Sequence, residues 1–110
     1  MIFKTIEIKS ERPIDIDTEI KFSIATARAE NIELLRFDIK RDDDSFSRVY
    51  NGAVKILKKM KNQAQVQFIA TPKAFNASNA EAEFLINKYP NQIKNMPNYG
   101  DGEAYIFVKL

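Results

Sequence analysis

The sequence of 110 residues contains no cysteine, no histidine and no tryptophan. Without cysteine there is no disulfide framework, no thiol nucleophile and no thiolate ligand for a metal ion. Without histidine the chain lacks the most common metal ligand and the usual general base near neutral pH. An enzyme built on this sequence would need a lysine, a tyrosine or a carboxyl pair with a shifted pKa. No spacing singles out such a group, so the sequence favours a non-catalytic protein without a cofactor.

Long apolar runs are also missing, and the start of the chain has no continuous apolar segment. A membrane-spanning helix needs about 20 consecutive apolar residues, and a secretory signal needs an apolar core of about 7 to 15. We therefore expect a cytoplasmic protein with no membrane span. The sequence has 45% apolar and 29% charged residues, no internal repeat and no Gly/Ser-rich linker, which predicts a single domain over residues 1–110.

Charge is nearly balanced in total but uneven along the chain. Seventeen basic and 15 acidic residues give a net charge of +2. No Asp or Glu occurs from residue 45 to residue 80, whereas residues 42–44 are three consecutive aspartates. Such segregation can mark a surface for an anionic partner, or it can reflect the preference of a helix for anions at its start and cations at its end. Helix capping accounts for the aspartates, so no metal site is predicted there.

Alternation of apolar and polar residues is the clearest pattern in the first forty residues. Apolar or small side chains occupy the even positions from Ile14 to Thr26, and the positions between them are mostly charged or polar. A period of two predicts a long β-strand with one wet face and a bend near residues 17–18. Similar patterns predict strands over residues 2–9 and 35–40. For residues 18–30 a helix is the alternative, because the Ala-Arg-Ala-Glu segment favours helical conformation.

A period of 3.6 residues begins at Ser45 and predicts an amphipathic helix over residues 45–62, with Asp44 or Ser45 as its N-cap. The rest of the chain predicts four further segments, namely a strand over residues 63–71, a second helix over residues 78–88, a connector over residues 90–102 and a strand over residues 103–110.

These elements follow the order β-β-β-α-β-α-β and predict an α+β fold. The expected architecture is a two-layer sandwich, in which a mixed, mainly antiparallel sheet carries two helices on one face. The predicted core combines apolar side chains from the sheet and from the helices that face it, namely Phe22, Ile24, Phe37, Val66, Phe68, Ile106, Val108, Phe46, Val49, Ala53, Leu57 and Phe84.

The other face of this sheet is the predicted interface. Tyr105 and Phe107 fall on it among polar residues. A pair of exposed aromatic side chains is unfavourable in water, so we expect another segment or another chain to cover them. Phe84 and Tyr89, in and just after the predicted helix over residues 78–88, are further predicted contacts, because that helix is apolar around much of its surface and buried aromatic residues dominate the energetics of many interfaces. We therefore predict that the protein acts by association through these four side chains, as a homodimer or as a subunit of an assembly. Cover by residues 90–102 of the same chain is the alternative.

A second possible function is binding of RNA or single-stranded nucleic acid. Arg48, Lys55, Lys58 and Lys59 share the polar side of the helix over residues 45–62. Cations on one helix face can contact phosphates, and an aromatic side chain on the open sheet face can stack on bases. The sequence contains no known nucleic-acid-binding signature beside these features.

A third possible function is a ligand pocket or a small active site between the second helix and the connector. Lys88, Tyr99 and Asp101 are the candidate residues, because they combine a cation, a phenol and a carboxylate in that region. A usable pocket there needs a concavity of at least about 300 Å³.

Overall fold

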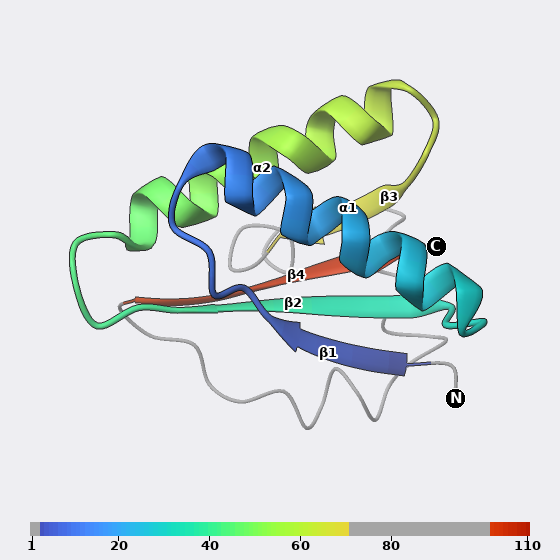
Figure 1. Ribbon diagram of the computed structural model, residues 1–110, viewed down its shortest axis with the longest axis horizontal. Helices are drawn as coiled ribbons and strands as arrows, with labels where there is room; N and C mark the ends of the chain where they lie inside the picture. Colours follow the sequence, from blue (N-terminus) through green and yellow to red (C-terminus); the bar gives the residue numbers. More distant parts are fainter. Residues whose placement is uncertain (1–2, 71–101) are drawn as a thin grey trace.

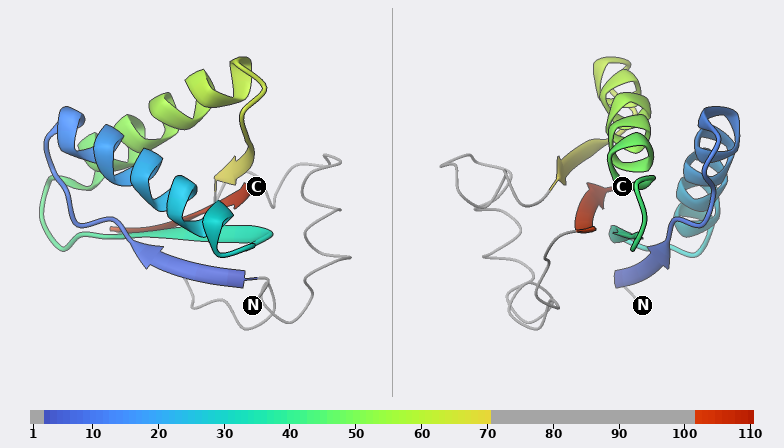
Figure 2. Two further views of the ribbon diagram at one scale, coloured as in Figure 1. Left: turned by 45° about the vertical axis from the view of Figure 1, so that its right-hand side comes forward. Right: turned by 90° about the vertical axis from the view of Figure 1, so that its left-hand side faces the viewer.

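The protein is a four-stranded sheet with two helices on one face, in a computed structural model that describes residues 3–70 and 102–110 (Figure 1; Figure 2). The described elements follow one another as β1 (Phe3–Glu7), α1 (Pro13–Ala29), β2 (Leu34–Lys40), α2 (Phe46–Asn62), β3 (Gln67–Ala70) and β4 (Glu103–Lys109). The strand order is β1-β2-β4-β3. β1 is parallel to β2, whereas β4 is antiparallel to both β2 and β3. The predicted α+β class, with a mixed, mainly antiparallel sheet, is confirmed.

The element order differs from the predicted one, because the second element is the helix α1 and not a strand. Its buried positions are spaced by three and four residues, and they are Ile16, Ile20, Ser23, Ile24 and Ala27. Two large apolar residues that fit only the alternating pattern, Ile14 and Phe22, are 70% and 71% exposed. The predicted strand over residues 14–26 is therefore wrong, and so is the assignment of Phe22 to the core.

The local sequence explains why this segment is helical. Pro13 occupies the first turn, where its fixed φ suits a helix and its missing N–H needs no partner. Asp15 in the first turn and Arg28 in the last turn complement the helix dipole. Residues 16, 20 and 24 are isoleucines four positions apart, so they satisfy a period of two and a helical period at once. Only the other apolar positions distinguish the two periods.

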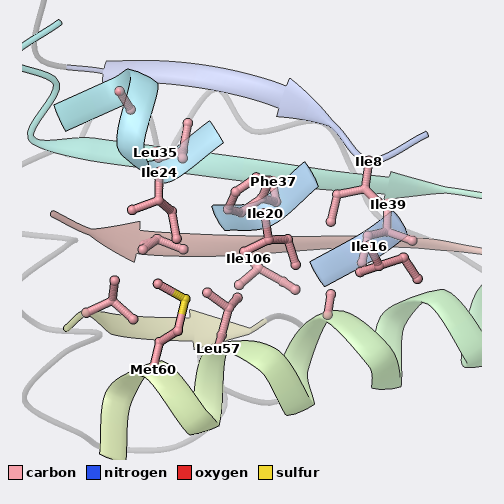
Figure 3. Packing of buried hydrophobic residues seen from close by; sticks show 14 of the residues in the cluster. Ile8, Ile16, Ile20, Ile24, Leu35, Phe37, Ile39, Leu57, Met60 and Ile106 are labelled. Carbon is pink, nitrogen blue, oxygen red and sulfur yellow. The ribbon is translucent and has the colours of Figure 1, made fainter. Parts of the chain in front are cut away.

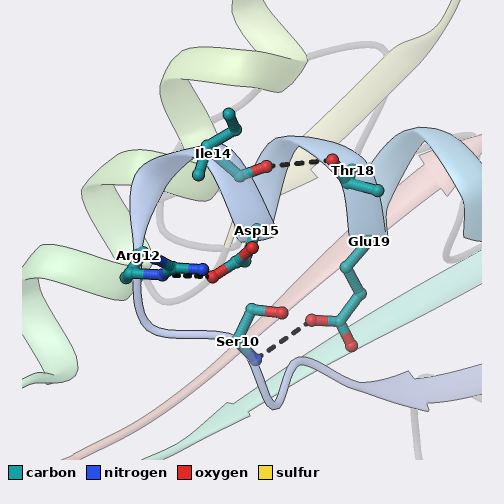
Figure 4. A network of polar contacts seen from close by, with 6 residues as sticks. All are labelled: Ser10, Arg12, Ile14, Asp15, Thr18 and Glu19. Carbon is teal, nitrogen blue, oxygen red and sulfur yellow. Dashed lines mark hydrogen bonds and ion pairs between the residues drawn. The ribbon is translucent and has the colours of Figure 1, made fainter.

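Polar contacts fix the start of α1 against the loop that leads into it (Figure 4). The Glu19 carboxylate accepts a hydrogen bond from the backbone N–H of Ser10, with an N···O distance of 3.1 Å. Arg12 Nε donates to Asp15 Oδ2 at 2.6 Å, three residues further along the chain. These contacts connect the first two turns of α1 to the loop that precedes the helix.

The helix α2 agrees with the predicted amphipathic helix, and its buried residues are Val49, Ala53, Leu57 and Met60. Figure 3 shows Leu57 and Met60 directed toward side chains of α1 and of the sheet. Together they form the main core, whose buried sheet members include Leu35, Phe37, Ile39, Ile106 and Val108.

The N-cap residue of α2 is Ser45, one of the two residues predicted for this position, but its contacts differ from those of a capping side chain. The Ser45 side chain makes no capping hydrogen bond to the helix. Its hydroxyl instead donates a hydrogen bond to Asp43 Oδ1. The same oxygen also accepts a hydrogen bond from the backbone N–H of Ser45, with an N···O distance of 2.9 Å. The carboxylate that orders this turn therefore belongs to Asp43, and not to Asp44.

The remaining predicted segments have mixed outcomes. β1, β2 and β4 fall within one residue of predicted strands or inside them. β3 begins at Gln67 and not at residue 63, because Gln63 follows the end of α2 and Ala64 has a φ of 57°, which turns the chain. The predicted helix over residues 78–88 lies outside the described residues, as does the connector except for Gly102. No helix within residues 3–70 is long and apolar enough to cross a membrane.

Candidate functional site

The sheet face opposite the helices is buried at its centre. Tyr105 is 0% exposed and Phe107 is 1% exposed, and Ile69 beside them is also buried. The sheet register pairs Phe107 with Arg36 on one side and with Ile69 on the other, and it pairs Tyr105 with Asp38. Both aromatic side chains occupy the helix-free face, as the alternation in β4 predicts. In the single chain neither of them presents an open surface.

A polar network surrounds Tyr105 on this face. Arg36 forms a two-pronged ion pair with Asp38, with N···O distances of 2.6 and 2.9 Å. The Arg36 guanidinium carbon lies 5.0 Å from the centre of the Tyr105 ring, and the Tyr105 hydroxyl donates to Glu103 Oε2 at 3.4 Å. Burial raises the pKa of Tyr105, and the carboxylates of Glu103 and Asp38 raise it further. Because these side chains partner one another, the network is better suited to holding the sheet than to chemistry.

The other predicted interface residues, Phe84 and Tyr89, lie outside the described residues. The same is true of Lys88, Tyr99 and Asp101, which were proposed for a ligand pocket. The predicted interface and the predicted pocket therefore stay predictions. Within residues 3–70 and 102–110, no group of three or more metal-ligating side chains comes together.

The outer side of α2 carries the four basic residues that the sequence singled out. Arg48, Lys55, Lys58 and Lys59 are all exposed. Every ion pair among the described residues involves other side chains, so these four cations form none in that part of the chain. The stretch without acidic residues thus forms a cationic surface that faces solvent on the helical layer.

A groove of about 490 Å³ opens to solvent between α1 and α2. Its α1 wall consists of Pro13, Ile14, Asp17 and Lys21. Its α2 wall and its far end consist of Gly52, Lys55, Ile56, Lys59, Met60, Gln63 and Gln65. We call this feature the interhelical groove.

The groove exists because the two helices are close at one point and separate from there. A Cβ atom on Gly52 would lie 3.5 Å from Ile16 Cδ1, an ordinary van der Waals distance, so the Ile16 side chain of α1 packs beside α2 at this position. Figure 1 shows α1 and α2 diverging toward the end of α2. At the far end the Arg28 guanidinium donates to the carbonyl of Gln65, which ties α1 to the turn after α2.

The groove combines an apolar floor with a basic rim. Ile14, Ile56 and Met60 supply the apolar surface. On the α1 wall, Lys21 is neutralised by Asp17, with Nζ and Oδ1 3.0 Å apart. On the α2 wall, Lys55 and Lys59 have no such partner among the described residues. This arrangement suits a ligand that has apolar side chains and carboxylates on one side.

Sequence reasoning identified only half of this site. Lys55 and Lys59 were named, although as phosphate ligands, because the absence of acidic residues around them is visible in the sequence. Ile14, Asp17 and Lys21 were missed, because they were placed in a strand. The signal for Ile14 exists once residues 13–29 are treated as a helix, since it then falls outside the buried stripe.

Comparison with known proteins adds no family to this description. No protein-family model matches the sequence, and neither the curated proteins nor the solved structures give a match. The function therefore has to be argued from the geometry of the chain itself.

Proposed function

We propose that this protein is a non-catalytic module that binds a protein partner through its helical layer. The main support is the interhelical groove, whose apolar floor of Ile14, Ile56 and Met60 is bordered by exposed lysines. A groove between two helices is a common docking place for an apolar segment of another protein. The cytoplasmic location predicted from the sequence is part of this proposal.

A different protein is a better partner for this surface than a second copy of the chain. In a symmetric dimer each patch meets its own copy, so the cations of α2 would face one another. A homodimer through Tyr105 and Phe107 would require aromatic side chains that are buried in the single chain. A partner with negative charge avoids both difficulties.

Nucleic acid is the second candidate ligand, because Arg48 and Lys58 extend the exposed cationic surface beyond the groove. Phosphates would gain from all four cations of α2 without sequence readout. However, the apolar floor of the groove has no role in phosphate binding. The burial of Tyr105 and Phe107 also removes the base-stacking surface that this function would use.

Site-specific photocrosslinking in the cells that make the protein tests the proposal. A photoreactive residue replaces Gln63, an exposed and uncharged residue of the groove, and the control replaces Ala29, which is exposed on α1 outside the groove. We expect a crosslinked species of discrete mass at position 63 only, which protease destroys and nuclease does not.

The other outcomes of this experiment contradict the proposal in different ways. A nuclease-sensitive product would favour nucleic acid, and a product of twice the mass of the chain would favour self-association. Equal crosslinking from positions 63 and 29, or none from either, would remove the groove as the place of association.

A further inference from the structure

Building on the proposed function, we infer that the interhelical groove binds an amphipathic helix whose apolar side is flanked by aspartate or glutamate. The partner helix would lie between α1 and α2, with its acidic flank toward α2. This inference names the chemistry of the partner, which the proposed function leaves open.

The length and lining of the groove fit a short helical segment. Gly52 and Gln63 mark its two ends on α2, about 16 Å apart at 1.5 Å per residue. That distance corresponds to about three turns, enough for apolar side chains spaced as i, i+3 or i+4, and i+7. Ile14, which is 70% exposed, and the half-buried Ile56 are the main surfaces that these side chains would cover, whereas Met60 lines the groove but is only 6% exposed.

The charge of the groove sets the orientation of the partner. Lys55 and Lys59 lie one turn apart on α2, and neither has an ion-pair partner among the described residues. Two carboxylates four residues apart on a facing helix match this spacing. The α1 wall is electrically neutral, because Asp17 already pairs with Lys21. An acidic flank on the partner therefore gains the most electrostatic attraction beside α2 and little beside α1.

A peptide-binding measurement on the purified full chain tests the inference. The probe is a fluorescein-labelled synthetic helix of about 18 residues, built from Leu, Ala and Glu, with Leu at helical spacing and Glu on one flank. We expect fluorescence anisotropy to detect saturable binding that weakens as salt concentration rises. A peptide with Lys in place of Glu, and one with the same composition in scrambled order, should bind at least about tenfold more weakly.

Matched variants separate the groove from general charge. K55E and K59E should each weaken binding of the acidic peptide by about three- to tenfold, whereas K58E, on the same helix outside the groove, should change it less than about twofold. The K55E/K59E double variant should bind the Lys peptide more tightly than the wild-type protein does. All three lysines are exposed, so the fold is expected to tolerate these changes.

A second pair of variants tests the apolar floor. Ile14→Ala should weaken binding several-fold, because it removes apolar surface from the groove. Phe22→Ala provides the control, since Phe22 lies on the same helix with nearly the same exposure but outside the groove. Unchanged circular dichroism of both variants shows that the helix remains folded.

Three results would overturn the inference. The first is binding of the scrambled peptide or of an oligonucleotide as tightly as the acidic helix, which would show recognition of charge alone. The second is a K58E variant that weakens binding of the acidic helix as much as K59E does. If the acidic helix fails to bind while photocrosslinking at position 63 still captures a protein, the partner chemistry is wrong and the proposed function stands. If the crosslink is missing as well, the proposed function is itself wrong.

Discussion

Asp43, in the loop before α2, orders the start of that helix through two contacts with Ser45. Its carboxylate accepts the hydroxyl and the backbone N–H of Ser45, and these hydrogen bonds lower the pKa of Asp43 from its ordinary value of 3.8. The charged form is thus the one that fits the folded protein. A sequence pattern indicates that an aspartate is needed here, but not which of three neighbours supplies it.

Replacing Ser45 by alanine should raise the pKa of Asp43 toward its ordinary value, because the hydroxyl donor is lost. Carboxyl NMR titration measures this change, and Ser47→Ala, at a neighbouring exposed serine, is the control that should leave it unchanged. The lowered pKa stabilises the folded state above the pKa of the unfolded chain, and this contribution is lost as pH falls through the folded value. An unchanged Asp43 titration in S45A would contradict the role of the hydroxyl.

Tyr105 provides the opposite pH dependence. Burial raises its pKa above the ordinary value of 10.0, with a further contribution from Glu103. The neutral phenol therefore stabilises the folded state fully below the unfolded pKa, and this contribution is lost as pH rises through the folded value. In urea unfolding, the wild-type protein should lose more stability between about pH 9 and pH 11 than Tyr105→Phe does. Parallel losses in the two proteins would show that Tyr105 titrates normally.

At the scale of elements, α1 shows where local pattern fails. Ile16, Ile20 and Ile24 fit both periods, and the polar residues between them supply the alternation. The decision depends on Ile14 and Phe22, whose exposure is a tertiary property. The α2 segment has no such ambiguity, because its apolar residues form a single stripe, and it was predicted to within one residue at its start.

Two alanine substitutions on α1 test the helical assignment. Ile20→Ala should lower the free energy of unfolding by about 2 to 5 kcal/mol, because Ile20 is fully buried. Phe22→Ala should change it by no more than about 0.5 kcal/mol, because the side chain is exposed. Chemical unfolding measures both. In a strand, residues 20 and 22 would share one face, so two comparably large losses would contradict the helix.

The site lies between elements, which explains why only part of it was predictable. The basic surface of α2 follows from composition and helical period, so Lys55 and Lys59 were identified from sequence. The groove also requires α1 beside α2, with Ile16 of α1 next to Gly52 of α2. Local periodicity contains no information on which helices become neighbours, so the apolar half of the site became visible only in the fold.

At the scale of the whole molecule, the two central strands of the sheet, β2 and β4, are buried on both faces. Ile106 and Val108 of β4 belong to the core beneath the helices, whereas Tyr105 and Phe107 are buried on the opposite face. The sequence predicted this division of β4, with alternate residues on the two faces. It left open whether the second face is covered by the same chain or by another, and the burial of Tyr105 and Phe107 occurs within one chain.

Adjacent substitutions in β4 therefore compare the two faces directly. Ile106→Ala should cost about 2 to 5 kcal/mol of unfolding free energy, and Phe107→Ala should cost about 3 to 5 kcal/mol, because both side chains are buried. Urea unfolding of dilute protein, with sedimentation at the same concentration, measures stability and oligomeric state together. If Phe107 instead served a partner chain, its loss would leave the unfolding of the monomer nearly unchanged and alter sedimentation. A large loss of stability in a monomeric F107A protein would make Phe107 part of the fold, and would leave the helical layer as the better surface for association.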